Sequence, residues 1–367
     1  MFGWVKWNTY KLFVYLTHRG DIGKPEIKVE ITDLFRRYQE FTEKHRAIYY
    51  NVLFNRLAIP NQDHKYVGGT LYQDKIVFTP NMSENLLIID KLSTYLVGNL
   101  PKGNYKWTGE AVYKDCIYFF SRLSSNLLVF DGERINEIKG FDYGREHHYG
   151  GILSNSDIIQ PPRSSSHFLI WNLDNKTATK LHICPEIISQ YFRYNCTILH
   201  PNGFVYFFPE KGYIIKMNPN NFKFKFIGNW VDRMIFDAKI LPDGNIYGFT
   251  TNRGGIIKFN IETEKVEYLF EDLSIESYGT KLGVNGKLYS IPGSGSYVWE
   301  YDYRTNSIRK LHNLNDYRYA KYAGGCTDKY GIIWGTPSFA DNIIKLVPNN
   351  DVLIPDELYK MFWVDCY

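Results

Sequence analysis

Short apolar runs that end in Asp or Asn recur along most of the chain, with more polar stretches between them. Six of them end at Asp90, Asp131, Asn172, Asn218, Asn260 and Asp302, which gives steps of 41, 41, 46, 42 and 42 residues. A seventh run, Ile343 to Val347 (IIKLV), keeps the apolar pattern without the final acid. Internal repeats with a period of about 20 to 50 residues are typical of repeat architectures. The pattern therefore predicts seven copies of one supersecondary unit.

Two further elements precede each run at a nearly fixed offset. The nearer one is apolar and aromatic: IVFTP (76–80), IYFFS (117–121), IIQPP (158–162), VYFFP (205–209), IYGFT (246–250), LYSIP (288–292) and IIWGTP (332–337). The farther one consists of small residues: Gly68-Gly69, Gly109, Gly150-Gly151, Cys196, Ala238, Gly279 and Gly324-Gly325. Turn sequences such as Pro242-Asp243-Gly244 stand between the two and suit a tight hairpin connection.

Each unit thus contains a small-residue strand, an aromatic strand and an apolar strand, followed by a more polar strand such as Lys265 to Leu269. Four short strands in about forty residues are typical of a β-propeller blade. The small residues fit innermost strands, which converge on a central channel. A β-helix has a much shorter period, and a helical solenoid needs apolar residues at 3.6 spacing. The sequence therefore predicts an all-β fold, a seven-bladed β-propeller over residues 65–348.

The repeat resembles the units of kelch-type and related propellers, in which a glycine pair, an Ile-Tyr strand and an apolar strand ending in Asp also recur. The resemblance covers Lys65 to Val347. Here, however, the glycines open the unit, and Pro or Thr follows the aromatic strand where kelch units carry their glycine pair. The Trp of a kelch fourth strand is also missing. The resemblance implies the propeller fold and leaves the function open, because propellers host many unrelated activities.

The segments outside the repeat are an N-terminal extension, residues 1–64, and a C-terminal tail, residues 349–367. In the extension, Thr32 is predicted to cap a helix that runs to about Tyr50. The apolar face of this helix would consist of Leu34, Tyr38, Phe41, His45 and Ile48. The basic residues beside it, Arg36-Arg37 and Lys44-His45-Arg46, are interpreted as a solvated face.

The seventh unit has no ordinary fourth strand after Ile343 to Val347, although Val352 to Ile354 is a short candidate. An unpaired blade edge would be exposed, so we expect the N-terminal extension to supply the missing strand. Tyr10 to Leu16 and Asn51 to Ile59 are the two candidates. The aromatic tail, YKMFW at 359–363, is expected to dock on the propeller, on the N-terminal helix or on another subunit.

Composition restricts the class of protein further. Hydrophobic residues make up 44% and charged residues 22% of the 367 residues, which is typical of a globular chain. The net charge of +4 is too small to indicate a nucleic-acid or membrane partner. Neither a signal peptide nor a membrane span is recognised. The sequons at Asn81, Asn175 and Asn195 are therefore interpreted as chance matches, and the expected location is cytoplasmic or within an assembled particle.

Candidate chemistry lies in the connections that a propeller gathers at one end of its channel. Basic residues are frequent in the segments before the first strands and after the second strands. We predict a basic channel mouth formed by Lys65, Lys106, Arg122, His147, Arg163, Arg193, Arg253 and Lys321. Such a ring would hold an anionic or sugar-like ligand, or an acidic loop of a partner. The alternative is that these side chains are simply solvated.

Catalytic and metal sites find little support in the sequence. Glu110 and Asp237 are the only carboxylates near the predicted channel, and calcium needs six or more oxygens. We expect these two side chains to be solvated or paired with Lys106 and Lys239. The five cysteines are widely spaced without a C-x-x-C pair, which favours reduced thiols over zinc ligands. No cofactor is predicted, and no motif of a hydrolase or a phosphate loop is present.

Two functions remain from this reading. The first is a non-enzymatic interaction module or structural subunit of a larger assembly, for which a virus or phage particle is one setting. Its partners would be other protein subunits. The second is a propeller that binds or hydrolyses an anionic or carbohydrate ligand at the basic mouth.

Overall fold

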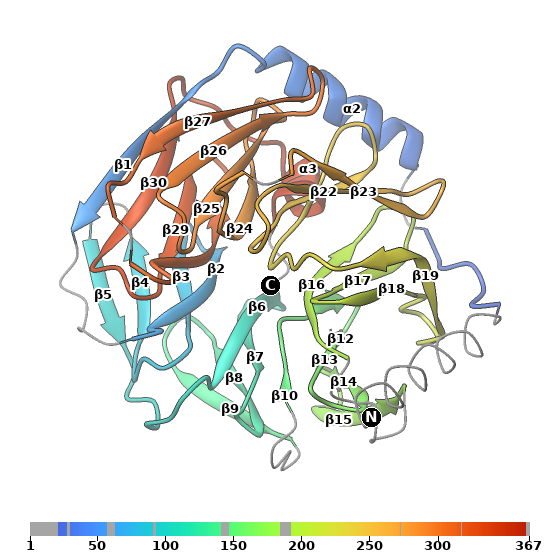
Figure 1. The fold of residues 1–367 in the computed structure, drawn as a ribbon. Coiled ribbons are helices and arrows are strands. Elements are labelled where there is room, and N and C mark those ends of the chain that lie inside the picture. Colours follow the sequence, from blue (N-terminus) through green and yellow to red (C-terminus); the bar gives the residue numbers. More distant parts are fainter. Residues whose placement is uncertain are drawn as a thin grey trace, which may run out of the picture.

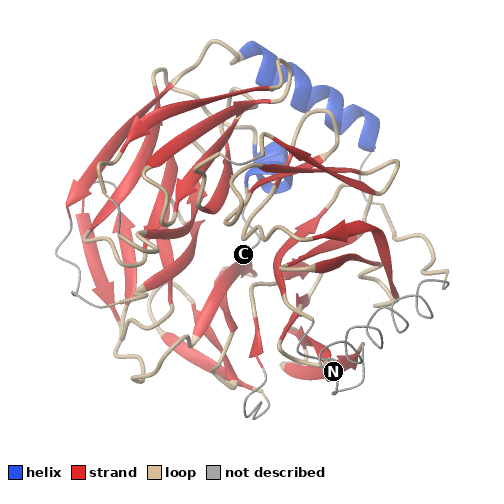
Figure 2. Ribbon diagram, in the orientation of Figure 1, coloured by secondary structure: helices blue, strands red, loops and turns tan. Residues whose placement is uncertain are grey.

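Seven four-stranded antiparallel sheets form a ring around a central axis in the computed structural model (Figure 1). The structure describes residues 21–27, 30–56, 63–90, 93–140, 147–183, 192–271, 273–316 and 318–364. Strands make up all seven blades, and the helices lie outside the sheets (Figure 2). The predicted all-β, seven-bladed propeller is confirmed.

The first four blades follow the chain from Tyr66. Blade 1 contains β2 (Tyr66–Tyr72), β3 (Lys75–Pro80), β4 (Leu86–Asp90) and β5 (Ser93–Val97). Blade 2 contains β6 (Trp107–Tyr113), β7 (Cys116–Ser121), β8 (Asn126–Phe130) and β9 (Ile135–Lys139). Blade 3 contains β11 (Ile152–Ser154), β12 (Asp157–Gln160), β14 (His167–Asn172) and β15 (Thr177–His182). Blade 4 contains β16 (Tyr194–Leu199), β17 (Val205–Pro209), β18 (Gly212–Met217) and β19 (Phe224–Val231).

The last three blades complete the ring. Blade 5 contains β20 (Lys239–Ile240), β21 (Ile246–Phe249), β22 (Ile256–Asn260) and β23 (Lys265–Leu269). Blade 6 contains β24 (Ser277–Leu282), β25 (Leu288–Pro292), β26 (Tyr297–Asp302) and β27 (Ser307–Asn313). Blade 7 contains β28 (Tyr322–Thr327), β29 (Ile333–Pro337), β30 (Asn342–Pro348) and β1 (Tyr50–Arg56). Blade 3 also carries a separate two-stranded ladder, β10 (His147–His148) with β13 (Pro162–Arg163).

The glycines that open the units have a backbone role in addition to the expected crowding at the axis. In blades 1, 2, 6 and 7 the pairing of the first and second strands shifts register after the first residue of the inner strand. Gly68 and Gly109 stand in these shifts with φ of +83°, a conformation that disfavours larger residues. A β-bulge therefore recurs at the same position of several inner strands.

The ring is closed by β1, which pairs antiparallel with β30 from Tyr50↔Pro348 to Arg56↔Asn342. This confirms that the N-terminal extension supplies the outer strand of the last blade, through the second of the two candidate segments. The hydroxyl of Tyr50 donates to Gly331 O at 3.0 Å and accepts from Val284 N at 3.0 Å. Tyr10 to Leu16 lies outside the described residues, and Val352 to Ile354 is not a strand.

The N-terminal helix is α2 (Ile31–Lys44), which is shorter than predicted. Its cap is Glu30, whose side chain accepts from Thr32 N, so the predicted cap at Thr32 is wrong. The helix ends at Lys44 because residues up to Tyr50 must turn into β1. Tyr38 lies on the buried face and its hydroxyl donates to Ile240 O at 2.9 Å in blade 5. Arg36, Lys44 and Arg46 are exposed, as expected, whereas Arg37 and His45 are half-buried.

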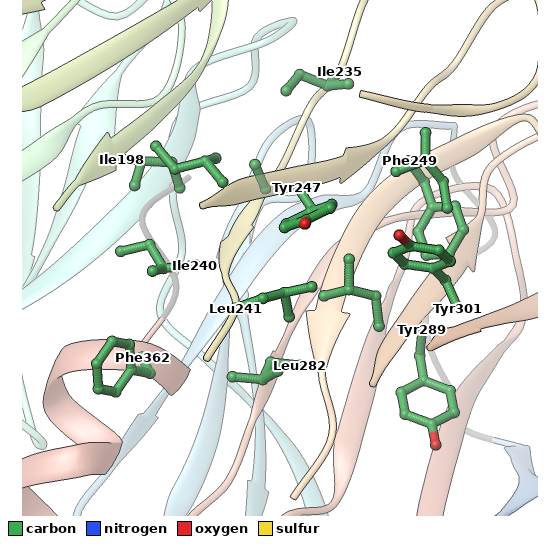
Figure 3. Close-up of a cluster of buried hydrophobic side chains, with 14 of the residues drawn as sticks. Ile198, Ile235, Ile240, Leu241, Tyr247, Phe249, Leu282, Tyr289, Tyr301 and Phe362 are labelled. Atoms are coloured by element: carbon green, nitrogen blue, oxygen red, sulfur yellow. The ribbon is translucent and has the colours of Figure 1, made fainter. Parts of the chain in front are cut away.

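The C-terminal segment folds into α3 (Asp356–Leu358) and the π-helical turn η2 (Tyr359–Trp363). The Phe362 ring stacks on Tyr38 at a centroid distance of 3.9 Å, and the Trp363 ring meets Tyr38 edge-on. Figure 3 shows Phe362 near Ile240 and Leu282, in the cluster that joins blades 5 and 6 to this segment. The tail therefore docks on the N-terminal helix and the propeller of its own chain. Among the described residues, no helix is long and apolar enough to cross a membrane.

Candidate functional site

A cavity of about 240 Å³ lies at the end of the axis where each chain segment leads into an inner strand. We call it the funnel. Its lining combines two arginines with a set of aromatic side chains: Arg122, Arg163, Tyr105, Tyr149, Phe236, Tyr278 and Tyr319. The inner strands place their first residues here, so six of the seven blades contribute to one small surface.

The two arginines are held by aromatic rings. The guanidinium carbon of Arg122 lies 4.3 Å from the ring centroid of Tyr105 and 5.1 Å from that of Tyr149. Arg163 contacts the same Tyr149 ring at 4.9 Å. A cation over a ring face is attracted by the ring quadrupole, more strongly where water is excluded. Tyr149 therefore positions both positive charges at one wall of the funnel.

These arginines carry donors that the described part of the chain does not use. No described residue accepts a hydrogen bond from the buried Arg122 Nε or Arg163 Nη1. Burial and the neighbouring Arg163 charge lower the pKa of Arg122. Burial raises the pKa of Tyr149, so this ring stays a neutral phenol near neutral pH. An anionic group placed in the funnel would relieve the repulsion between the two guanidinium groups and satisfy their N–H groups.

The irregular backbone of blade 3 brings Arg163 into place. The pairing of β10 with β13 sets His147 opposite Arg163, and Arg163 also forms an isolated bridge with Arg193. The ladder is separate from the main sheet of blade 3 because Pro161, between β12 and β13, has no N–H to donate. The sequence element IIQPP therefore supplies the second arginine of the funnel.

The rest of the wall is a row of aromatic rings in contact with one another. Ring centroids are 5.6 Å apart for Tyr149 and Phe236, 5.1 Å for Phe236 and Tyr278, and 6.2 Å for Tyr278 and Tyr319. The last two contacts are edge-on, a geometry that aromatic pairs favour. Tyr319 stands at the rim with 62% of its surface exposed. The funnel thus offers an apolar wall opposite a positively charged one.

The three predicted lysines do not line the funnel. Lys65, Lys106 and Lys321 occupy equivalent positions, directly before the first residue of an inner strand, and all three are buried. Burial lowers the pKa of each one, that of Lys106 to about 8. Their ammonium groups are therefore not presented at the funnel, because each side chain turns back into the protein.

The ammonium groups of two of these lysines bind backbone carbonyls of the preceding blade. Lys106 Nζ donates to Ser83 O and Pro101 O, both at 2.8 Å. Lys321 Nζ donates to Ser294 O and Arg318 O, both at 3.2 Å. Ser83 and Ser294 lie in the connections between the second and third strands of blades 1 and 6. These lysines therefore fasten neighbouring blades together.

The other predicted residues lie around the funnel without lining it. His147 is half-buried, and burial together with Arg122, Arg163 and Arg193 lowers its pKa. Arg193 lies 3.7 Å from Glu210 Oε1. Arg253 pairs with Asp232 at 2.9 Å on the exposed surface. Of the eight predicted residues, the structure brings only Arg122 and Arg163 into the cavity.

The two carboxylates near the axis have partners other than those expected. The Asp237 carboxylate pairs with Lys281 Nζ at 2.7 Å, a partner that was not expected, and both side chains are buried. Glu110 accepts from the Thr79 hydroxyl, while Lys106 binds the carbonyls given above, so the expected pairing of Glu110 with Lys106 is wrong. The described residues contain no group of three or more side chains that could hold a metal ion.

The aromatic wall was missed by sequence reasoning, although one position carries its signal. In every blade except blade 5, the first residue of the inner strand, or its equivalent in blade 3, pairs with the last residue of the aromatic element, as in Ser277↔Pro292 and His148↔Pro162. The next residue along the chain lines the funnel in blades 1, 3, 6 and 7. That position holds Tyr149 in the third unit and Tyr278 in the sixth. Aligning the units on their prolines would have found it.

Fold and cavity together define a seven-bladed propeller with a cationic, aromatic funnel at one end of its axis. Comparison with solved structures supports the propeller fold. The chain is similar to a catalytically inactive virginiamycin B lyase from Staphylococcus aureus, solved with quinupristin (TM-score 0.69, 14% identity, 81% of this chain and 99% of that chain). It is also similar to a streptogramin B lyase (TM-score 0.67, 15% identity, 82% and 98% coverage).

A third similar structure is the hydrazine synthase of Kuenenia stuttgartiensis (TM-score 0.62, 11% identity, 81% of this chain and 99% of that chain). Identities of 11% to 15% show the propeller fold alone. No family model and no curated protein matches the chain. Membership of the kelch family is therefore not confirmed.

Proposed function

We propose that this propeller is a non-enzymatic binding module whose funnel receives a carboxylate from an acidic segment of a partner protein. One observation carries the proposal. Arg122 and Arg163 line one cavity, and each has a buried N–H group for which no described residue provides an acceptor. Burying donors without partners is unfavourable by about 1–3 kcal/mol each, and a bound carboxylate removes that penalty.

The chemistry of the funnel selects the ligand group. A guanidinium group presents donors in a fixed plane that matches the two oxygens of a carboxylate. No carboxylate of the described residues lines the cavity, so nothing there would repel an acidic ligand. A volume of about 240 Å³ accommodates one or two side chains rather than a folded domain. The funnel would therefore take the tip of a loop or a chain end.

The surface beside the funnel supports a partner protein as the source of the carboxylate. Tyr319 and Leu123 expose 62% and 44% of their surface near the funnel arginines. Tyr and Arg are enriched at protein interfaces, where aromatic groups supply contact area around a polar anchor. The chain would then be a subunit of a larger assembly, and a virus or phage particle is one such setting. The aromatic tail does not add to this argument, because it is already docked within the chain.

The test is a binding titration by fluorescence anisotropy with a labelled hexaglutamate peptide, and hexaglutamine as the neutral comparison. We expect hexaglutamate to bind at least about tenfold more tightly, because the interaction is charge-assisted. Arg122→Gln and Arg163→Gln should each weaken hexaglutamate binding by about tenfold. Arg253→Gln is the matched control, since this exposed arginine lies outside the funnel.

Two outcomes would overturn the proposal. Equal binding of the two peptides, or equal loss in the Arg253→Gln control, would mean that the funnel does not recognise carboxylates.

The carbohydrate alternative is tested in the same assay with cellohexaose as an unlabelled competitor. Binding of cellohexaose that depends on Tyr278 and Tyr319, without any binding of hexaglutamate, would replace the proposal with a glycan site.

A further inference from the structure

The aromatic row in the funnel is part of a closed circle of flat side chains. From Tyr319 the contacts continue to Phe339 at a ring-centroid distance of 6.0 Å, from Phe339 to His64 at 4.3 Å, and from His64 to Tyr105 at 5.3 Å. Tyr105 lies beside the Arg122 guanidinium, so the circle returns to its cationic side. Burial and the Arg122 charge lower the pKa of His64, which keeps this imidazole neutral near pH 7. The positive charge of the circle therefore lies on one side.

The floor of the funnel is apolar and made of small side chains. Val67 of blade 1 and Ala323 of blade 7 line the cavity and form one buried cluster with Tyr149, against which Phe236 packs. A ring that enters the funnel would meet this floor and the aromatic sides, and its surface would be removed from water. The funnel is therefore shaped for an aromatic group as well as for an anion.

One ring of the wall is fixed against the backbone. A Cβ at Gly293 would lie 2.4 Å from Cγ of Tyr278, so the Tyr278 ring packs directly on this glycine. Gly293 is itself held, since its N–H donates to Glu276 O at 2.9 Å, just before Tyr278 in the chain. Binding surfaces whose groups are already in place lose less conformational entropy on binding. This part of the wall is therefore preformed.

Positive charge and aromatic wall lie close together. Tyr149 contacts both guanidinium groups and also the Phe236 ring, at 5.6 Å. A ligand that uses both features must therefore carry a carboxylate and a ring a short distance apart. An aromatic residue at a chain end meets this requirement, because only Cα and Cβ separate its carboxylate from its ring. In a loop, an acidic and an aromatic side chain would both have to enter the same cavity of about 240 Å³ together with their backbone.

We propose that the funnel binds the C-terminal residue of a partner chain and that this residue is aromatic. Its carboxylate lies at Arg122 and Arg163, and its ring lies among Phe236, Tyr278 and Tyr319. Contacts between aromatic rings add to the effect of apolar burial, which favours a terminal Phe, Tyr or Trp over an aliphatic residue. This inference rests on the function proposed above, where a loop tip and a chain end were both open, and it selects the chain end.

Three hexapeptides with a label at the N-terminus test the proposal by fluorescence anisotropy. Pentaglutamylphenylalanine ends in the proposed residue, pentaglutamylalanine lacks the ring, and diglutamyl-phenylalanyl-triglutamate has the same composition and charge with its ring inside the chain. We expect pentaglutamylphenylalanine to bind at least about tenfold more tightly than each of the other two. Equal affinity for the alanine peptide would overturn the aromatic contact. Equal affinity for the isomer would overturn recognition of the chain end.

Variants locate the bound ring. Phe236→Leu keeps an apolar side chain in the wall but removes its aromatic face, so the preference for pentaglutamylphenylalanine over pentaglutamylalanine should fall by about three- to tenfold. Affinity for pentaglutamylalanine should stay unchanged, which a general loss of structure would not allow. Phe54→Leu, at an exposed position on β1, is the matched control and should keep the preference. A folded Phe236→Leu variant that keeps the full preference overturns the proposal. If it does not fold, Tyr319→Leu at the exposed rim decides by the same criterion.

The two peptide series separate this inference from the function on which it rests. If hexaglutamate binds more tightly than hexaglutamine through Arg122 and Arg163, while pentaglutamylphenylalanine shows no preference, only the inference fails. If none of the acidic peptides binds, both fail.

Discussion

Two histidines in blade 3 are buried as neutral rings. His148 Nε2 lies 3.1 Å from His167 O, His167 Nδ1 lies 3.1 Å from Ser165 Oγ, and the two ring centroids are 5.1 Å apart. Burial lowers the pKa of His148 to about 3 and that of His167 to about 4. Protonation of either ring in the folded protein would place a charge beside another imidazole and Lys180. The unfolded chain carries no such penalty, since its histidines titrate near about 6.5.

This difference predicts acid destabilisation of the fold. Both folded-state pKa values lie below the unfolded value, so the stabilisation is complete above about pH 6.5 and is lost as the pH falls. Between pH 7 and pH 5, the free energy of unfolding of the wild type should fall by about 1–2 kcal/mol more than that of a His148→Gln variant. Urea denaturation at the two pH values measures both. The same decrease in variant and wild type would contradict the prediction, and His312→Gln on the outer strand β27 is the control.

Among the elements, the strands were the most predictable part of the chain. The apolar runs ending at Asp90 and Asn260 coincide with β4 and β22 because alternation, turn residues and repeat period all agree there. The sequence predicted that a strand of the N-terminal extension closes the ring. It did not decide which strand, because two N-terminal segments have the composition of a strand. Only the pairing of β1 with β30 distinguishes between them. The end of α2 was placed too late, because apolar spacing continues into residues that the turn towards β1 requires.

The candidate site was also predicted only in part. Basic residues in the connections could be read from the sequence, and Arg122 and Arg163 do line the funnel. The burial of Lys106 and Lys321 could not be read, since it depends on carbonyl groups of the neighbouring blade. A separate cavity of about 520 Å³ was missed entirely. Part of its wall is the C-terminal segment, whose docking place depends on contacts over some three hundred residues of chain.

The closing strand β1 provides a prediction for a single hydroxyl group. Tyr50→Phe removes the group that links Val284 N and Gly331 O across blades 6 and 7, and leaves both buried polar groups without this partner. We expect a loss of about 1–3 kcal/mol in the free energy of unfolding. Tyr49→Phe is the matched control, because its neighbouring side chain is 52% exposed and should change stability little. Equal denaturation midpoints for the two variants would show that the Tyr50 hydroxyl does not stabilise the closure.

At the scale of the whole molecule, α2 and the C-terminal segment form a clasp over one face of the ring. Trp363 is fully buried against Tyr38 and Phe41, and the Tyr38 hydroxyl is bonded to blade 5. The N-terminal helix and the C-terminal segment are therefore fixed to the same part of the propeller. This clasp also builds one wall of the cavity of about 520 Å³ that is separate from the funnel, so the stability of the ring and the shape of that cavity share a structural cause.

Loss of the clasp should destabilise the fold. Trp363→Ala removes a fully buried ring and is expected to lower the free energy of unfolding by about 3–5 kcal/mol. Urea denaturation measures the change. Val364→Ala, next to it and 38% exposed, is the control. Equal denaturation midpoints for the two variants would mean that the clasp does not stabilise the ring.

The pairing of β1 with β30 also means that β1 is synthesised long before the strand with which it pairs. Tyr50 is made early, but its partner Pro348 follows 298 residues later (348 − 50). At about 5–20 residues per second, a nascent chain would carry the unpaired β1 segment for about 15–60 seconds. Leu53 and Phe54 keep 48% and 40% of their surface exposed even in the finished ring, and both are unprotected throughout that interval. The first blade-forming strand to leave the ribosome is thus the last to be used, and successful expression depends on keeping it from pairing with another chain.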